Sequence, residues 1–237
     1  MENNKYSKMQ KELYENMANT WNIENRDPVV GSFDEHNNWK DYENLFEKIP
    51  LEKWKEMDVL DFATGPGRNI VKYNERFKRV DGVDISEQNL QNAKKWITEN
   101  NINIEQVKLY LCNGYNLENI QNESYDLVMS TIAFQHICVY EIRKNYLKEF
   151  YRILRKGGYI SIQMGYGSPS PRTVSYYENY YEATSTNRGC DVAISSPNEL
   201  KKDLEEIGFT NFSCIISKTG PGDIHPNWIY FTAEKNE

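Results

Sequence analysis

The residues best suited to chemistry are two carboxylates with a turn of small residues between them. Asp61 lies in the apolar run 57–62, and the small-residue turn 64–67 follows it directly. A turn of this kind between a strand and a helix lets backbone N–H groups meet a ligand. Asp84 ends the next apolar run, where an acidic side chain accepts hydrogen bonds from ribose hydroxyls. The pattern predicts a site for a nucleoside cofactor.

A nicotinamide or flavin dinucleotide would use both of these features. That class needs a small residue three positions after the second glycine of its motif, so that the helix packs closely on the strand. Here Gly65 and Gly67 are followed by Ile70 at that position. The turn therefore favours a nucleoside that has no pyrophosphate to cradle.

With these residues the chain resembles the class I S-adenosylmethionine-dependent methyltransferase family, whose first motif is Asp/Glu-x-Gly-x-Gly-x-Gly after a strand. Asp61, Gly65 and Gly67 match that motif, and Ala63 replaces its first glycine, a variation that the family tolerates. Further matches follow in order at Asp84 and at the segments 112–115, 125–130 and 154–158. The resemblance covers residues 57–235.

The resemblance implies S-adenosylmethionine as methyl donor and S-adenosylhomocysteine as product. Asp84 is expected at the ribose, Asn113 at the adenine amino group, and Asp61 near the cofactor's own amino group unless it only caps the following turn. The full set expected at the cofactor is Asp61, Ala63, Gly65, Asp84, Ile85, Asn113, Gly114, Tyr115 and Ser130. Methyl transfer of this kind is an in-line displacement, which depends on alignment of the reactants more than on acid or base groups.

The chain has three histidines, and none has the spacing of a metal ligand, so we expect no metal. His136 follows the fourth expected strand and either contacts the acceptor or bonds local backbone. His225 lies with Asp223 in the Gly- and Pro-rich loop 220–228, which is expected at the acceptor site. An imidazole there can act as a base near neutral pH. His225, His136 and Asp223 are therefore the catalytic candidates, whereas His36 is expected at the surface or in a structural role.

These residues need a scaffold that brings strand ends together. Strands are expected at 57–62, 80–85, 107–112, 125–130, 159–164, 212–217 and 228–233, with helices at 68–77, 86–99, 141–154 and 197–207. Such alternation is typical of a doubly wound α/β fold with a mostly parallel sheet covered on both faces. Only a short connection precedes the seventh strand, so that strand should run antiparallel to the sixth.

Two further segments frame the expected methyltransferase domain, which spans residues 57–237. Residues 1–56 have helical spacing of apolar side chains and are expected to form an N-terminal helical cap. Residues 165–196 show no regular period and are expected to form a loop-like lid. The lid supplies the substrate candidates Tyr166, Arg172, Tyr177, Tyr181 and Arg188, although such tyrosines more often serve packing and such arginines are most often solvated charges.

Composition narrows the partners and the compartment. The formal net charge is −7 and no basic run is present, which argues against nucleic acid and anionic membranes as partners. The four cysteines are scattered and no apolar stretch is long enough to span a membrane, so we expect reduced thiols and a cytoplasmic protein. The oligomeric state stays open.

The sequence therefore predicts methylation of a small-molecule acceptor, with O-methylation of a sugar, a sugar nucleotide or a phosphorylated compound as the main hypothesis. N-methylation of a small amine or amino sugar is the first alternative. A non-catalytic methyltransferase-like binding subunit is the second. Methylation of protein or RNA is disfavoured by the acidic charge and by the lack of a basic extension.

Overall fold

A single mixed sheet organises the part of the chain that the computed structural model describes, namely residues 2–20, 40–182, 191–220 and 222–236. Its strands are β1 (Asp58–Phe62), β2 (Arg79–Asp84), β3 (Leu109–Leu111), β4 (Tyr125–Ser130), β5 (Leu154–Tyr166), β6 (Thr173–Ser175), β7 (Asp191–Ile194), β8 (Phe209–Lys218) and β9 (Asn227–Lys235). The α-helices are α1 (Glu2–Thr20), α2 (Arg68–Tyr73), α3 (Glu87–Glu99), α4 (Tyr140–Ile153) and α5 (Pro197–Ile207). Short 3₁₀ helices are η1 (Lys40–Leu45), η2 (Leu51–Glu56), η3 (Ile104–Gln106) and η4 (Phe134–His136). Among these described elements, no helix has the length and apolarity needed to cross a membrane.

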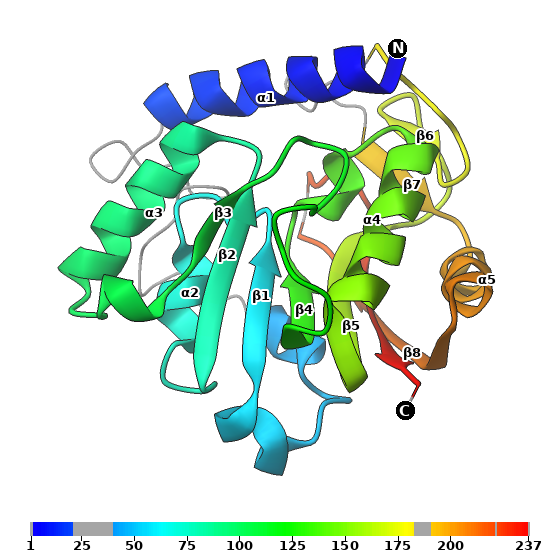
Figure 1. Ribbon diagram of the computed structural model, residues 1–237. Helices are drawn as coiled ribbons and strands as arrows, with labels where there is room; N and C mark the ends of the chain where they lie inside the picture. The colour runs from blue at the N-terminus through cyan, green and yellow to red at the C-terminus, as the bar shows by residue number, and fades with distance from the viewer. Residues whose placement is uncertain (1, 21–39, 183–190, 221, 237) are drawn as a thin grey trace.

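The sheet confirms the predicted doubly wound topology. Its main path runs β3-β2-β1-β4-β5, all parallel, and β9 pairs antiparallel with both β5 and β8. Alternate side chains serve two cores: in β4, Val128 belongs to the core that includes α4 and α5, whereas Leu127 and Met129 belong to the core that includes α2 and α3. Both faces of the sheet are therefore covered (Figure 1).

Local sequence signals begin and end the helices that frame this sheet. The Ser86 side chain caps α3 by accepting a hydrogen bond from the backbone N–H of Asn89. A capping box of Ser196 and Glu199 begins α5, and Gly208 ends it in a left-handed conformation. These signals are why the bounds of α3 and α5 match the sequence prediction closely.

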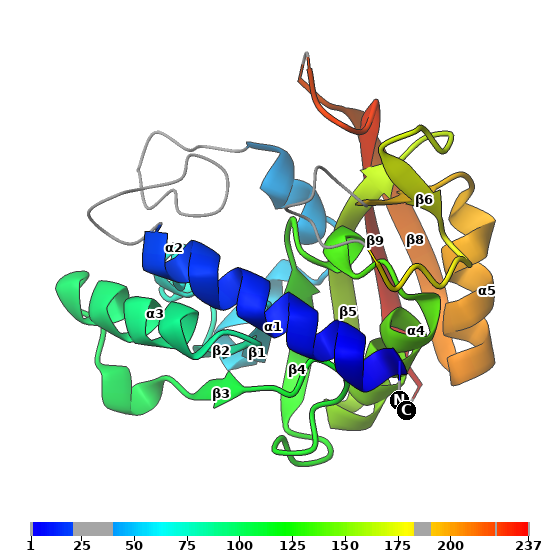
Figure 2. The same ribbon diagram turned by 90° about the horizontal axis from the view of Figure 1, so that it is seen from above.

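The chain winds in opposite directions from β1 and β4, and α1 lies across this point. Ligands bind outside the carboxyl ends of the strands where the strand order reverses. Figures 1 and 2 show α1 crossing over those ends, with its C-terminal half beside α3. The first described element of the chain thus roofs the site that the sheet creates.

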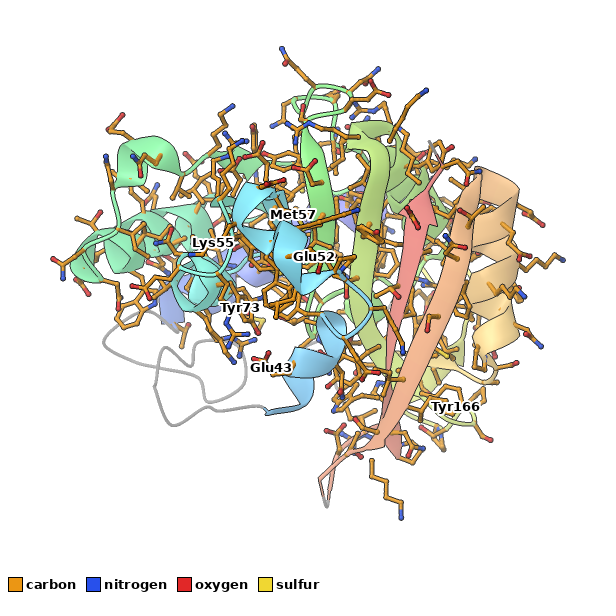
Figure 3. The ribbon with its side chains drawn as sticks, turned by 90° about the horizontal axis from the view of Figure 1, so that it is seen from below. Glu43, Glu52, Lys55, Met57, Tyr73 and Tyr166 are labelled. Atoms are coloured by element: carbon orange, nitrogen blue, oxygen red, sulfur yellow. The ribbon has the colours of Figure 1, made fainter. Side chains whose placement is uncertain are left out.

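The rest of the N-terminal segment takes a different place from α1. The segment that contains η1 and η2 packs on the sheet face that carries α2. There the Phe46 ring, between the two short helices, lies 4.9 Å from the Tyr73 ring, centroid to centroid. Figure 3 shows this segment running from Glu43 to Met57 alongside Tyr73. A helical cap was expected over residues 1–56. Helix α1 covers the strand ends, whereas η1 and η2 complete the core that includes α2 and α3.

The expected loop-like lid is more ordered than its sequence suggested. Within residues 165–196, β6 and β7 pair in parallel, and β7 pairs with the end of β5. Val192 and Ile194 are buried, as is Tyr176, whose hydroxyl donates to Asp203 at 2.9 Å. This segment therefore extends the sheet in its described part, and residues 183–190 lie outside the described residues. The period was missed because each of these strands is only three or four residues long.

Candidate active site

The turn after β1 has the backbone shape that a close ligand approach requires. Ala63, Gly65 and Gly67 all have positive φ, at 56°, 54° and 84°. Such angles suit glycine and strain alanine, so Ala63 holds a glycine conformation where the methyltransferase motif has glycine. Ala63 and Gly65 both line a cavity of about 600 Å³, a size typical of small-molecule sites.

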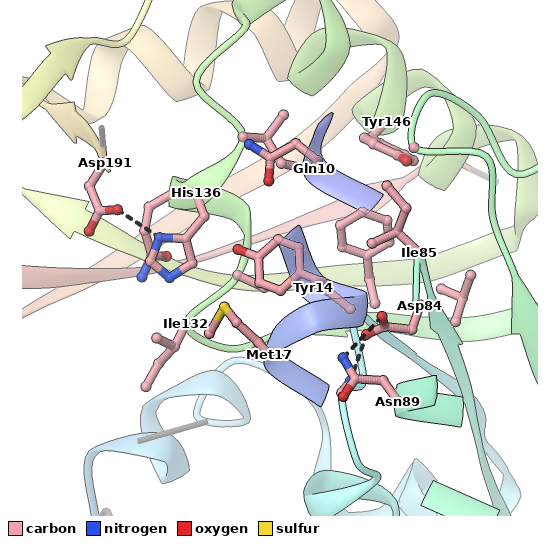
Figure 4. A pocket seen from close by; sticks show the side chains of 18 of the residues that line it. Gln10, Tyr14, Met17, Asp84, Ile85, Asn89, Ile132, His136, Tyr146 and Asp191 are labelled. Atoms are coloured by element: carbon pink, nitrogen blue, oxygen red, sulfur yellow. Dashed lines mark hydrogen bonds and ion pairs between the residues drawn. The ribbon is translucent and has the colours of Figure 1, made fainter. Parts of the chain in front are cut away.

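Asp84 lines the cavity next to the turn after β1. Its Oδ2 accepts from the Gly65 N–H and its Oδ1 from the Ser86 N–H, both at 2.8 Å. Burial raises the pKa of Asp84, although these N–H groups and the amide of Asn89 oppose the rise. The carboxylate thus ties the turn after β1 to the start of α3 and also borders the cavity (Figure 4). The carboxylate that the resemblance places at the ribose is thus held by a hydrogen bond on each oxygen.

Gly114 lines the cavity between Ile85 and helix α1. Its φ is 81°, and a Cβ placed there would lie 2.7 Å from Ile85 Cδ1 and 2.9 Å from Ser7 Cβ of α1. The Ser7 hydroxyl donates to the Gly114 carbonyl at 2.9 Å. Gly114 is thus needed for α1 to approach, and Ile85 and Cys112 line the cavity beside it.

Asp61 lies behind the turn and outside the lining of the cavity. Its Oδ1 accepts from the Asn69 side chain at 3.1 Å, and its Oδ2 has no hydrogen-bond partner among the described residues. Burial raises the pKa of Asp61 to about 6, against the opposing effect of Asn69. An orphaned carboxylate oxygen suits a cationic group such as the amino group of S-adenosylmethionine. A second hollow of about 60 Å³ lies nearby, lined in part by Arg68 and Thr131.

Besides Asp61, three more residues expected at the cofactor lie off the cavity, and the placement predicted for them is corrected. Asn113 is exposed, and its Oδ1 accepts from the backbone N–H groups of Tyr115 and Asn116 at 2.9 Å, so it shapes a turn. Tyr115 is exposed. The buried Ser130 hydroxyl donates to the Phe62 carbonyl at 3.1 Å and joins β4 to β1. A sequence motif gives the position of these residues along the chain, but it does not determine the direction in which their side chains point.

The cavity lining also contains a histidine paired with a carboxylate. The Nδ1 of His136, in η4, lies 2.6 Å from Oδ1 of Asp191, the first residue of β7. Burial lowers the pKa of His136, but the charge and hydrogen bond of Asp191 and the Ile132 carbonyl outweigh it, so the net pKa is raised. Burial likewise opposes the charge of Asp191, yet His136 and His225 hold its pKa below its usual value. Figure 4 shows the pair facing the cavity under α1.

Asp191 is a site residue that the sequence prediction missed. It lies at the start of a four-residue strand inside a segment that was expected to be a loop, and no neighbouring motif marks it. Its spacing to His136 in the chain carries no signal, since only the pairing of β5 with β7 brings the two together. The backbone just before His136 is also unusual. Ile132 has φ of 48°, which is rare for a β-branched residue, and such strain concentrates at functional sites.

The loop candidates divide between the cavity and the core. Asp223 lines the cavity together with Gly222, Ile224 and Trp228. His225 is 1% exposed and does not line it; its Nε2 lies 3.2 Å from Asp191 Oδ2. The expectation that the His225 imidazole faces the acceptor is therefore corrected, because the ring is packed inside the loop.

The predicted substrate residues lie away from the cavity. Tyr166, Arg172, Tyr177 and Tyr181 are absent from its lining, and Arg188 lies outside the described residues. Arg172 and Tyr177 are exposed, while the Tyr181 ring packs edge-on against Tyr6 at 6.3 Å. Helix α1 lines the cavity instead, through Tyr6, Gln10, Tyr14 and Met17 (Figure 4). Their helical spacing was visible in the sequence, but not the surface that they face.

The roof is fixed to the body of the domain by polar contacts. The Tyr6 hydroxyl accepts from the Cys138 N–H at 2.8 Å, beside the catalytic candidate His136. The Glu15 carboxylate accepts from the Glu87 and Gln88 N–H groups at 2.8 and 3.0 Å, at the N-terminus of α3. Any ligand in the cavity therefore lies beneath a helix that is docked at both ends. Among the described residues, no cluster of three or more His, Cys, Asp or Glu could hold a metal ion.

Comparisons with known proteins agree with this geometry. Residues 59–158 match the family model described as a methyltransferase domain. No curated protein matches the chain. Solved structures share the fold, and three of them are a nematode, an archaeal and a bacterial protein.

Phosphoethanolamine N-methyltransferase 2 of Haemonchus contortus, solved with phosphomonomethylethanolamine and S-adenosylhomocysteine, is 18% identical; the match covers 93% of this chain and 57% of that one, with a TM-score of 0.64. A methyltransferase of Methanosarcina mazei is 15% identical over 77% of this chain and 94% of its own, with a TM-score of 0.58. A Thermotoga maritima protein described as a possible histamine N-methyltransferase is 20% identical over 83% and 88%, with a TM-score of 0.56.

The matched segment runs from β1 through α4 to the start of β5, and it contains the positive-φ turn, Asp84 and His136. These are the residues around which the cavity is built. The chain therefore contains a methyltransferase domain, and both the matched segment and the cavity agree with the class I S-adenosylmethionine-dependent methyltransferases that its sequence resembles.

Proposed function

We propose that the chain transfers the methyl group to a hydroxyl oxygen of a small polar metabolite of the sugar type. The observation that carries this proposal is the His136–Asp191 pair, with 2.6 Å between Nδ1 and Oδ1, in the same cavity as Asp84. A histidine oriented by a carboxylate is the usual arrangement for a general base. A hydroxyl acceptor gains from such a base, whereas phosphate and carboxylate oxygens need none.

The bond to Asp191 decides which nitrogen of His136 can act. An ionised carboxylate only accepts hydrogen bonds, so Nδ1 carries a hydrogen and the neutral ring accepts a proton at Nε2. When bound, S-adenosylmethionine supplies a methyl group on a positively charged sulfur. His136 takes the acceptor's proton as the new carbon–oxygen bond forms and the carbon–sulfur bond breaks. Asp191 stabilises the imidazolium that results.

The charges around the cavity support an acceptor without an anionic group at the reacting end. Its described lining includes Asp84, Asp191 and Asp223 and contains no lysine or arginine. A phosphate in contact with these carboxylates would be repelled. A sugar nucleotide or phosphorylated sugar fits only if its phosphate stays away from this lining.

A buried amide gives separate support for a hydroxyl-rich acceptor. Gln135 is fully buried and belongs to the cavity lining, and neither atom of its side-chain amide has a partner among the described residues. Unpaired buried amides are costly, so a ligand that both donates and accepts is favoured there. A hydroxyl has both capacities.

N-methylation of a small amine is the second candidate. The same carboxylates, with Tyr14 and Trp228 in the lining, suit a cation, and the structural neighbours include N-methyltransferases. An amine acceptor must lose its proton before it attacks, and His136 could accept that proton too. The two candidates therefore differ in the atom that carries the methyl group.

Methyl transfer from ¹³C-methyl-labelled S-adenosylmethionine to fractionated metabolites distinguishes them. Neutral sugars and polyols, phosphorylated sugars and small amines are supplied separately, and the product methyl carbon is identified by NMR. We expect an O-methyl product from the neutral hydroxyl fraction. An N-methyl product as the main signal would replace the first proposal by the second. Arg172→Ala, which changes an exposed residue off the cavity, serves as the matched control.

A further inference from the structure

Asp191 is shared between two imidazoles that come from distant parts of the chain. Its Oδ1 lies 2.6 Å from His136 Nδ1, and its Oδ2 lies 3.2 Å from His225 Nε2. Because the carboxylate can only accept, both ring nitrogens donate to it. Each carboxylate oxygen is then held from one side, and rotation of Asp191 would break both bonds at once.

The position of His225 is fixed more strongly than a loop residue requires. Its ring covers Gly165 of β5 so closely that a Cβ there would lie 2.1 Å from the ring's Cε1. The Trp228 ring lies 5.4 Å away, centroid to centroid. The His225 N–H donates to Asp223 Oδ1 at 3.2 Å, and its carbonyl accepts from the Thr219 hydroxyl at 2.5 Å. Sheet, loop and carboxylate therefore all fix this one imidazole.

We propose that His225 is a positioning residue that holds the Asp191 carboxylate in the orientation that His136 needs. The proposal rests on the proposed function in one respect, namely that His136 is the base. It assigns His225 no contact with the acceptor, because the ring is buried and does not line the cavity. The loop that supplies Asp223 to the cavity wall is thereby tied to the catalytic pair.

The charged and polar groups near the two imidazoles contact them in different ways. Asp191 faces both imidazoles from β7, and Asp223 contacts His225 only through the backbone N–H. The Tyr6 hydroxyl donates to the His136 carbonyl at 3.4 Å and so contacts its backbone and not its ring. Asp191 is the acid that links the two rings.

The test uses substitutions that keep or remove the bond to Asp191. His225→Gln keeps an amide N–H near the position of Nε2, and His225→Met has similar bulk without a donor. Gly165→Ala leaves His225 chemically intact and displaces its ring from β5. Gly220→Ala is the control, because Gly220 lies in the same loop with open space around it and no positive φ.

The readout is the downfield proton resonance of His136 Nδ1–H, recorded without cofactor, together with kcat. With three histidines in the chain, the signal is assigned from His36→Asn and His136→Gln spectra. We expect the resonance in the parent, in His225→Gln and in Gly220→Ala, and its loss or exchange broadening in His225→Met and Gly165→Ala. In those two variants kcat should fall on the order of tenfold, as for loss of one positioning hydrogen bond, with S-adenosylmethionine affinity and melting temperature showing that the site is folded.

Parent-like resonance and kcat in both His225→Met and Gly165→Ala would overturn the proposal. Loss of the resonance with unchanged kcat would establish the link between His225 and His136, and would instead remove His136 from the role of base. Recovery in His225→Gln separates a donor requirement from mere packing.

Discussion

At the scale of single residues, the site depends on backbone angles as much as on functional groups. Ala63 has φ of 56° at the position where the methyltransferase motif has glycine. The left-handed region costs a non-glycine residue roughly 1 to 2 kcal/mol. The turn therefore stores strain beside the cofactor.

Ala63→Gly should raise the free energy of unfolding. Relief of strain is offset in part by the greater freedom of glycine in the unfolded chain, which leaves a gain of up to about 1 kcal/mol. Denaturant unfolding measures it. Ala93→Gly, the same change inside α3, should destabilise by about 1 kcal/mol. Equal losses in both variants would show that the turn is not strained.

The pH dependence of turnover is the second residue-scale prediction. A general base acts in its neutral form, and the pKa of His136 is raised by Asp191 and the Ile132 carbonyl against the effect of burial. The acid limb of the kcat profile should therefore lie above the ordinary histidine value of about 6.5, with kcat falling as pH drops through the raised pKa. Asp191→Asn should move that limb to lower pH. A limb that stays in place in Asp191→Asn would assign the titration to another group.

The same pair makes an opposite contribution to stability. Since the folded-state pKa of His136 is raised, its share of the stability is complete below the unfolded value of about 6.5 and is lost as pH rises through the folded value. Activity and stability should therefore respond to pH in opposite directions across this range.

At the scale of elements, α1 controls the enclosure of the site. The Glu15 carboxylate accepts from backbone N–H groups at the start of α3, a position where a negative charge is favourable. Burial is the largest single effect and raises its pKa, but the hydrogen bonds from Gln88, Glu87 and Ser86 together outweigh it and lower the pKa below the ordinary value of 4.5. The contact therefore persists until the pH falls below that value.

Glu15→Ala should loosen α1 and weaken cofactor binding by roughly three- to tenfold, the scale of a partly exposed charge at a helix N-terminus with its hydrogen bonds. Hydrogen exchange of α1 amides and calorimetry with S-adenosylmethionine measure it. Glu12→Ala removes an exposed neighbour whose ion pair within the described part of the chain is with Lys8, at 3.9 Å, and is the control. Parent-like exchange of α1 in Glu15→Ala would show that other contacts hold the roof.

The elements β6 and β7 lead to a different expectation from that of a mobile lid. The buried Arg143 donates to the carbonyls of Ile137 and Tyr176, and Tyr176 is also held by Asp203. Amides of Val192 and Ile194 should therefore be protected without ligand nearly as well as those of β5. Rapid exchange at both positions would restore the lid interpretation.

At the scale of the whole molecule, the sequence was sufficient for the sheet and insufficient for the cavity wall. Long apolar strands and capped helices such as α3 and α5 carry their own signals, and Asp84 could be identified from its motif. The acceptor end could not, because Asp191, His136 and α1 meet only through tertiary pairing. Asn113 failed for a related reason: its backbone follows the motif, while its side chain bonds its own turn.

The measurement that tests the account most directly is turnover of His136→Gln with cofactor binding measured on the same sample. The account predicts a fall in kcat of at least about 10²-fold, the usual contribution of a general base, with S-adenosylmethionine affinity close to that of the parent because Asp84 and the turn after β1 are untouched. Turnover at the parent rate, with the cofactor bound normally, would contradict the assignment of His136 as the base.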